Sequence, residues 1–293
     1  MIDLRLRRRV GRHAPVTPGQ VALLVAMLVV TLFPIYWMVL ASFKTNADLL
    51  GGGGVSLLPD PRTLQFGNYL RMWRDLHFGD YLRNSLIVCS AATALAVGIA
   101  SLSGFALGYF RFRGSGPYGL VVIATQLLPG ILFLLPVYLI FRQIQDLTGT
   151  QMIDTYQGLI LLYVAFFLPL SVWILRGYFS AIPRELLEAA QVDGASVLGA
   201  FWRVLLPLSV PGLVATGTYV FLSAWDELLF ASVMTNSLAT QTVPVGVRSF
   251  IGIYGAHYDL LMAAATVACI PPAIIFLFLQ RQMVGGLTAG AVK

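Results

Sequence analysis

One stretch near the middle of the sequence, residues 184–194, places charged side chains next to small and apolar ones. The stretch contains Arg184, Glu185, Glu188, Ala189, Ala190, Asp193 and Gly194. Alanines allow a second surface to approach closely, and a carboxylate such as Glu188 can pair with a cation on that surface. An exposed short helix of this kind is suited to dock in a groove of a soluble partner. The chemistry indicated is protein binding.

A second group of residues, Trp225-Asp226-Glu227, follows a long apolar run. An aromatic face beside carboxylates suits a sugar ring and its hydroxyl groups, so these three residues are candidates for a substrate pathway. Two other interpretations remain open. The residues could hold the end of a span at the membrane interface, as aromatic residues often do, or they could face a partner subunit. One acidic pair is too little for a proton relay.

The residues that catalytic motifs require are missing. The chain has only two lysines, Lys44 and Lys293, and neither follows a GxxxxG run, so the sequence has no loop to hold a nucleotide phosphate. It also contains neither an HExxH nor a GxSxG motif. We therefore expect no catalytic residues and no enzymatic activity in this polypeptide.

Metal binding and disulfide bonding are not indicated either. The candidate ligands are few and scattered: His13, His77, His257, Cys89 and Cys269. None of the histidines pairs with Cys, Asp or Glu at a metal-ligand spacing. Both cysteines lie within apolar runs, where a small buried packing residue is the simplest interpretation.

The composition is that of a membrane protein. Apolar residues make up 58% of the 293 residues and charged residues 11%, against about 25% charged residues in soluble domains. A helical span needs about 20 mostly apolar residues. Six stretches meet this requirement: about 20–43, 85–110, 118–141, 157–179, 207–232 and 259–280. The sequence therefore predicts an all-α membrane protein with six transmembrane helices.

Basic residues predict the orientation of these spans. The chain carries a net charge of +6, and five arginines precede the first span: Arg5, Arg7, Arg8, Arg9 and Arg12. Lys and Arg flank membrane helices on the cytoplasmic side, so this charge does not indicate nucleic-acid binding. Both termini are expected in the cytoplasm, with a tail at 1–19, a six-helix domain at 20–280 and a second tail at 281–293. The expected location is the bacterial inner membrane, with several passes through its lipid.

Small residues in the second span favour close helix packing. Gly104 and Gly108 form a GxxxG pattern, which lets the backbones of two helices approach in lipid. The partner helix could belong to this chain or to another subunit.

The loop between the fourth and fifth spans, residues 180–207, has the signals of two helices joined by a turn. Ser180 could cap a first helix that starts near Pro183. Gly194 could end it in the left-handed conformation, and Ser196 could cap a second helix that runs toward Pro207.

This loop resembles the EAA loop of ATP-binding-cassette (ABC) importer permeases. The matching residues are Glu188-Ala189-Ala190-Gln191-Val192-Asp193-Gly194-Ala195, followed by Leu206-Pro207 and Pro211. Further likeness to the carbohydrate branch lies in Asn68-Tyr69, Asn84-Ser85-Leu86, Asp154-Thr155 and Trp225-Asp226-Glu227. Asp226 replaces the asparagine that is commoner in the family. The C-terminal stretch Gly285–Lys293 resembles the tail of the maltose-type second permease subunit.

The resemblance implies a type I ABC importer permease fold and a set of partners. These would be a second homologous permease, two copies of an ABC ATPase, an extracytoplasmic solute-binding protein and a sugar substrate. ATP and Mg would bind to the ATPase, and this chain would hold no cofactor. The 184–194 residues would couple the chain to the ATPase, with a second contact at Gly286, Leu287, Thr288 and Gly290.

Two alternatives to an importer subunit remain open on the sequence. A stand-alone secondary carrier or channel for a small polar solute would have similar spans. So would a structural membrane subunit of another complex. Within the carbohydrate branch, disaccharides, oligosaccharides and glycerol-phosphate compounds are all compatible with the residues.

Overall fold

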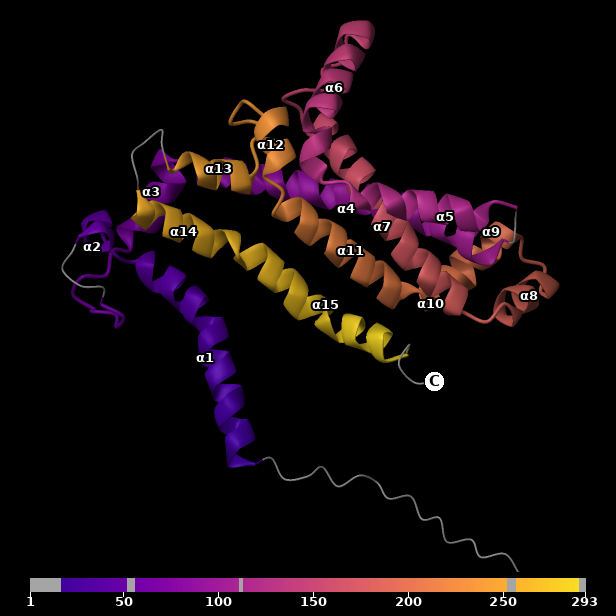
Figure 1. Ribbon diagram of the computed structural model, residues 1–293, viewed down its shortest axis with the longest axis horizontal. Coiled ribbons are helices and arrows are strands. Elements are labelled where there is room, and N and C mark those ends of the chain that lie inside the picture. The colour runs from indigo at the N-terminus through magenta and orange to yellow at the C-terminus, as the bar shows by residue number, and fades with distance from the viewer. Residues whose placement is uncertain (1–16, 52–55, 111–112, 252–256, 290–293) are drawn as a thin grey trace, which may run out of the picture.

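The computed structural model describes residues 17–51, 56–110, 113–251 and 257–289, and for Ser115 and residues 281–289 only the backbone. All regular elements in these ranges are helical. Four long helices lie side by side as the body of the molecule (Figure 1): α4 (Phe78–Tyr109), α7 (Tyr156–Ala181), α11 (Val210–Trp225) and α15 (Ile270–Ala289). α4 and α7 form the most extensive pair, and α11 packs on both of them and on α15.

Two further long helices are almost bare within this chain. α1 (Pro18–Ala41) buries only its last two residues, Leu40 and Ala41. α6 (Leu134–Thr148) buries none, and it projects away from the four-helix body (Figure 1). Apolar helices with so little cover must meet lipid or another membrane protein, because water would leave their side chains unfavourably hydrated.

The number of spans agrees with the sequence prediction. Within the described residues, five helical stretches are long and apolar enough to cross a membrane: 18–41, 78–109, 130–148, 156–181 and 258–280. A bent pair of segments, 197–208 and 210–225, makes a sixth if it is counted as one span, and its two parts meet at 75°.

The third span is not the continuous 118–141 helix that hydropathy predicted. The chain forms α5 (Ser115–Ala124), the short 3₁₀ turns η1 (Thr125–Leu127) and η2 (Gly130–Phe133), and then α6. Leu128 adopts an extended conformation between the two turns. It precedes Pro129, and a residue before proline is pushed away from the helical region by the proline ring. The helix therefore breaks there, and α6 extends seven residues past the predicted end.

The fifth and sixth spans also differ from the predicted ranges. α11 ends at Trp225 rather than near 232, and a separate short helix, α12 (Leu229–Met234), follows. The last span consists of α14 (Tyr258–Ala268) and α15, which meet at Cys269 just before Pro271. α15 continues as a helix beyond residue 280, where a tail was predicted to begin.

Small residues join α4 to α7. A Cβ atom placed on Gly104 would lie 3.0 Å from the backbone nitrogen of Arg176 and 3.1 Å from the Cβ of Leu175. One on Gly108 would lie 3.0 Å from the hydroxyl oxygen of Ser180. The GxxxG pattern therefore packs within this chain, and the two helices form a stiff pair.

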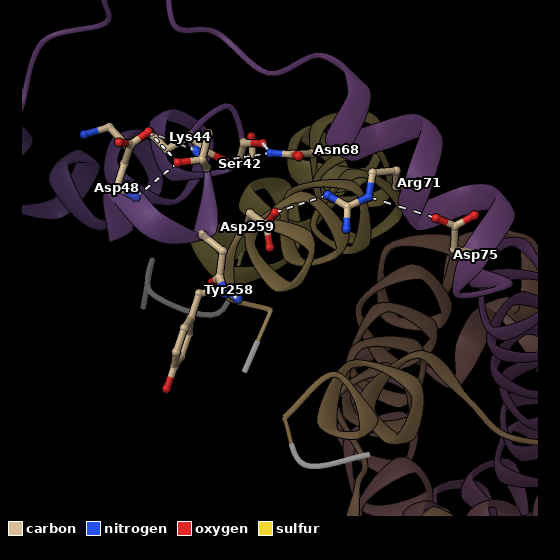
Figure 2. Close-up of polar contacts among 10 residues, drawn as sticks. Ser42, Lys44, Asp48, Asn68, Arg71, Asp75, Tyr258 and Asp259 are labelled. Atoms are coloured by element: carbon tan, nitrogen blue, oxygen red, sulfur yellow. Dashed lines mark hydrogen bonds and ion pairs between the residues drawn. The ribbon is translucent and has the colours of Figure 1, made fainter. Parts of the chain in front are cut away.

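Short helices cover the end of the body opposite the 180–207 loop. They are α2 (Asn46–Leu50), α3 (Gly67–Asp75), α12 and α13 (Val243–Ser249). Figure 2 shows how polar groups join this end. The Asn68 side chain donates to the backbone oxygens of Ser42 (3.0 Å) and Lys44 (2.8 Å), and Arg71 lies 3.6 Å from Asp259 at the start of α14. Asp259 is only 3% exposed. We call this end the outer end, in line with the predicted topology.

Candidate functional site

The 180–207 loop lies at the opposite end, which we call the cytoplasmic end in line with the predicted topology, and contains the short helix α8 (Glu185–Val192). Leu187 is its one buried residue, at 1% exposure. Glu185 and Glu188, both in the first turn, are exposed, where the positive end of the helix dipole favours them. Leu186 and Val192 are exposed apolar residues, and Val192 is 88% exposed. α8 therefore presents both charge and apolar surface outward.

The capping prediction for Ser180 is wrong. α7 continues to Ala181, so Ser180 lies within the last turn of α7, next to Gly108 of α4. Arg184 is the N-cap residue of α8 and makes no side-chain cap. The α4–α7 packing holds Ser180 in the longer helix, and only Ile182 to Arg184 remain as the connection.

The end of α8 is a Schellman motif built on Gly194. The Gly194 N–H donates to the carbonyl of Gln191 (3.0 Å), and the Ala195 N–H donates to the carbonyl of Ala190 (2.9 Å). Gly194 has φ +87°, which favours glycine because other residues place a Cβ against the backbone there. The predicted glycine turn is confirmed, and Asp193 lies exposed beside it.

The second helix of the loop begins at α9 (Val197–Ala200), where the Ser196 hydroxyl accepts the Gly199 N–H (3.1 Å) as predicted. The chain then passes through a π-helical turn, η3 (Phe201–Leu205), and α10 (Leu206–Leu208) before the 75° bend into α11. π turns occur mostly at functional positions in helices. The loop is thus continuous with the fifth span.

An apolar cluster fixes the loop to the ends of α4 and α7. Leu187 of α8 belongs to it, together with Phe105, Phe179, Phe201 and Leu205. Phe105 of α4 contacts Phe201 of η3 with ring centroids 4.8 Å apart, and Phe179 of α7 contacts Phe201 at 5.9 Å. Movement of the loop would therefore be transmitted to both helices.

Tyr109, the last residue of α4, also contacts α8, and sequence reasoning missed it. Its backbone oxygen accepts a hydrogen bond from the Arg184 guanidinium (3.0 Å), and its hydroxyl accepts one from the Gln191 amide (3.3 Å). The only sequence signal was the adjacent Gly104–Gly108 pattern, which indicated that α4 is packed at this level but named no partner for α8.

The three residues of the predicted substrate pathway separate in the structure. Trp225 is 3% exposed and stacks on Phe221 with ring centroids 5.6 Å apart. Glu227 accepts the Tyr163 hydroxyl (3.0 Å) and the N–H groups of Phe230 and Ala231 (both 2.9 Å).

Glu227 therefore caps α12 and is fully engaged in the fold. Asp226, between Trp225 and Glu227, is exposed. Of the three, it is the residue whose side chain is free to face a solute.

The other polar residues singled out near the outer end hold the segment 234–243. The Asn84 amide donates to the carbonyls of Leu238 and Gln241 (both 2.9 Å), and its oxygen accepts the Tyr156 hydroxyl (2.6 Å). The Ser85 hydroxyl accepts the Val243 N–H (2.8 Å). These contacts join parts of the chain about 70 to 160 positions apart, so they are structural.

Asp154 fixes the same segment by its charge. Its carboxylate accepts the N–H groups of Asn236 (2.9 Å) and Ser237 (3.0 Å) and the Thr240 hydroxyl. Partial burial by itself raises the pKa of Asp154, but these hydrogen bonds outweigh it and lower the pKa from 3.8 to about 2. The charged form is the one that the fold stabilises.

Comparison with known proteins identifies the family of this chain. Residues 96–287, which include α7, the loop and α11, match the family described as binding-protein-dependent transport system inner membrane component. The chain belongs to this family. It is therefore a multi-pass inner-membrane permease subunit, not a stand-alone carrier, and ATP hydrolysis belongs to a separate subunit of such transporters.

Curated relatives match the permease along nearly its whole length. The trehalose/maltose transport system permease protein MalG of Thermococcus litoralis is 39% identical over 272 residues, which cover 92% of this chain and 94% of the relative. The diacetylchitobiose uptake system permease protein DasC of Streptomyces coelicolor is 35% identical, with the same two coverages. The arabinooligosaccharides transport system permease protein AraQ of Bacillus subtilis is 31% identical and covers 96% and 99%.

Solved structures confirm the fold of the permease. A chain of a bacterial ABC transporter involved in the import of the acidic polysaccharide alginate aligns with a TM-score of 0.76 and 20% identity, over 90% of this chain and 94% of that one. A chain of the MetNI methionine ABC transporter aligns with a TM-score of 0.52 and 16% identity, over 71% and 93%. The fold is that of a type I ABC importer permease, as expected.

The predicted contact at the C-terminal end is described only in part. Gly286, Leu287 and Thr288 continue the helix α15, and their side chains are not described. Gly290 lies outside the described residues. Among the residues that are described, no three His, Cys, Asp or Glu side chains gather at a distance that could hold a metal ion.

Proposed function

We propose that this permease forms half of the translocation pathway of an ATP-driven, binding-protein-dependent sugar importer, and that α8 is the helix an ABC ATPase grips. The observation that carries the proposal is the geometry of α8. Leu187 fixes its inner face to α4 and α7, while Glu188 and Val192 are exposed at the cytoplasmic end. A helix held on one side and bare on the other is ready to dock.

The proposed coupling residues fall into two groups: some have exposed side chains, and others contact the permease itself or form the turn after α8. Glu185, Glu188 and Asp193 are exposed carboxylates that a cation of the ATPase could meet, and Ala189 is exposed and small enough for close approach. Ala190 is partly buried and belongs to the contact with the permease itself. Gly194 forms the turn that sets the angle between α8 and α9.

A second permease is supported by the bare helices. α1 and α6 lack a partner among the described residues of this chain that would bury them, and the segment 130–148 reaches a hydropathy that suits a membrane. A homologous subunit would cover part of this surface and lipid the rest. Two permeases would then place two α8 helices below the membrane, one for each of two ATPase subunits.

The sugar class rests on the relatives. Their names specify trehalose and maltose, diacetylchitobiose and arabinooligosaccharides, so we propose a disaccharide or short oligosaccharide delivered by an extracytoplasmic binding protein. Asp226 is the residue of this chain that we assign to the pathway, because Trp225 and Glu227 are committed to packing and capping.

In this mechanism ATP and Mg bind to the ATPase subunits, and this chain holds neither. Closure of the ATPases would move the two α8 helices together, and the spans would rock to open the cavity outward. Hydrolysis would return the cavity to the inward-open state. Such a cycle is a shift between two states, driven by a ligand that binds one of them better. The C-terminal residues Gly286–Gly290 would add a second contact to the ATPase.

The test is uptake of labelled maltose, trehalose and short oligosaccharides by the full transporter in vesicles, with ATP hydrolysis measured alongside. The double variant Glu188→Lys with Gly194→Pro should insert normally but hydrolyse ATP without import, because the charge and the turn that dock α8 are both lost. Asp60→Lys, which makes the same change of charge at an exposed position between α2 and α3, is the matched control. Normal sugar uptake by the double variant would contradict the proposal.

A further inference from the structure

Tyr109 contacts α8 near both of its ends. Arg184, the N-cap residue, donates to the Tyr109 backbone oxygen (3.0 Å), and its guanidinium lies 5.6 Å from the centre of the Tyr109 ring. Gln191, the penultimate residue of α8, donates to the Tyr109 hydroxyl (3.3 Å). One residue of α4 thus spans the length of the docking helix.

The Tyr109 ring is itself held in place. It stacks on Phe105 with ring centroids 5.3 Å apart and an interplanar angle of 24°, and it meets Phe110 edge-on at 5.1 Å. Phe105 in turn contacts Phe201 of η3. Beneath these rings, Gly104 and Gly108 bring α4 into close contact with α7. Tyr109 is therefore attached to the closely packed pair of α4 and α7.

α8 has little else to keep it in position. It has eight residues, and an isolated helix of fewer than about 12 residues is marginal in water. It buries only Leu187, and its chain connection to α7 is three residues long. The apolar contact is made by Leu187 and by the partly buried Ala190, one turn apart on the same face. Such contact resists separation more than rotation, whereas directional contacts near both ends resist rotation as well.

We propose that Tyr109 is a positioning residue for coupling, which fixes the orientation of α8 through Arg184 and Gln191 and passes the displacement of α8 directly to α4. This inference rests on the proposed function of α8. It assigns to Arg184 a contact within the permease, whereas its position in the loop sequence indicated a contact with the ATPase. A hydrogen bond from a charged group is among the stronger ones in a protein, so Arg184 is the larger of the two contacts.

The experiment uses the complete transporter reconstituted in sealed lipid vesicles and two measurements. Hydrogen exchange of the amides of residues 185–192 reports how firmly α8 is held, and the number of ATP molecules hydrolysed per sugar imported reports coupling. Arg184→Ala should raise the exchange rate by about tenfold, the effect of losing one charge-assisted hydrogen bond, and should raise the ATP cost per sugar severalfold. The ATPase should still copurify. Arg203→Ala, which removes an exposed arginine from η3 of the same loop, should change neither quantity.

Two further variants, Tyr109→Phe and Gln191→Ala, separate the contacts of Tyr109. Tyr109→Phe keeps the ring and the backbone oxygen and loses only the bond from Gln191, so its effect should be about threefold or less. Gln191→Ala should match it, and the two changes together should do no more than either alone. Because these variants leave the aromatic cluster intact, they test the hydrogen bond without disturbing the packing of α4.

Unchanged exchange in 185–192 together with an unchanged ATP cost in Arg184→Ala and in Tyr109→Phe with Gln191→Ala would overturn the inference. This result can be distinguished from a failure of the proposed docking function of α8. If Glu188→Lys with Gly194→Pro abolishes coupled uptake while the Tyr109 contacts prove neutral, α8 docks the ATPase but is positioned in another way.

Discussion

The outer and cytoplasmic ends of this permease are built from different interactions. At the outer end, the side chains of Asn84, Asp154 and Glu227 each make three hydrogen bonds. Six of these nine bonds join backbone groups, four of them in the distant segment 234–243. At the cytoplasmic end, the 180–207 loop is held by an apolar cluster and by the two side-chain contacts to Tyr109.

The difference in polar groups matches a difference in task. Directional bonds to backbone groups fix a segment in one geometry, because each lost partner leaves a buried polar atom unpaired. An apolar cluster with a few polar contacts at its edge holds a loop together but leaves its outward carboxylates unsatisfied and available. The outer end is thus fixed as a scaffold, whereas the cytoplasmic end presents the exposed surface that our proposal assigns to a partner.

The largest effect is expected at the contact between α4 and α7, the two long helices that connect the outer end to the cytoplasmic end. In Gly104→Val, the added side chain would push against the backbone nitrogen of Arg176 and separate α4 from α7, at a cost of about 3 kcal/mol. Thermal unfolding in detergent should show a large drop in Tm, and the purified yield should fall. Gly98→Val on the same helix is the control, since a Cβ there meets no atom within 4 Å. Equal Tm values for the two variants would mean that the close α4–α7 contact at Gly104 does not contribute to stability.

The next effect should be confined to the outer end. Asn84→Ala removes two donated hydrogen bonds and one accepted bond and leaves the carbonyls of Leu238 and Gln241 without this donor. We expect a loss of about 2 kcal/mol, measured as a lower Tm and faster proteolysis of the segment 234–243. Asn236→Ala, at an exposed position in the same segment, should be nearly neutral. If Asn84→Ala has the Tm of the native protein, the hydrogen bonds of Asn84 do not stabilise the outer end, and the proposed difference between the two ends is wrong.

The cytoplasmic end should respond in the opposite way, with a loss of coupling and little loss of stability. Gly194→Ala forces a side chain into the left-handed region, at a cost of about 1 kcal/mol. Tm should change little, whereas sugar import per ATP should fall. Gly114→Ala imposes the same strain at φ +97° in another cytoplasmic turn and should leave coupling intact. If both variants lose coupling equally, the effect is not specific to the turn after α8.

The smallest effect concerns pH at the outer end. Because the pKa of Asp154 is lowered to about 2 in the folded protein from 3.8, its charged form adds stability above pH 4, and that contribution is lost as the pH falls through about 2. The Tm difference between the native protein and Asp154→Asn should therefore be constant from neutral pH down to about pH 5 and shrink below about pH 4. Thr240→Val, which removes one donor to the carboxylate, should move the loss to higher pH. A difference that is the same at all pH values would contradict this account.

Much of the cytoplasmic site could be predicted because its determinants are local. Gly194 and Ser196 act on backbone groups within five positions of themselves, and a pattern of that length can be read along the chain. Ser180 shows the limit of such reading. Its type suits a cap, but packing against Gly108, more than 70 positions away, places it inside α7.

The sequence could identify Trp225, Asp226 and Glu227 as notable residues but could not assign a role to each of them. Trp225, Asp226 and Glu227 suggested a sugar site by residue type. The structure shows that a tryptophan can serve packing and a glutamate can serve as a helix cap, and that only Asp226 of the three is exposed. Which neighbours a side chain meets depends on helices that are far apart in the sequence, so no local pattern could have separated the three.

The sequence by itself determined that this protein lies in a membrane, where its long apolar stretches are, and which loop carries the short helix that we propose as the docking helix. Hydropathy and short capping patterns suffice for these features because each depends on neighbours along the chain. Only the tertiary structure decided where the third span breaks away as α6, which acidic residue is left exposed, and that Tyr109 holds α8. These features depend on packing between distant segments, and that packing is set by the fit of whole helices.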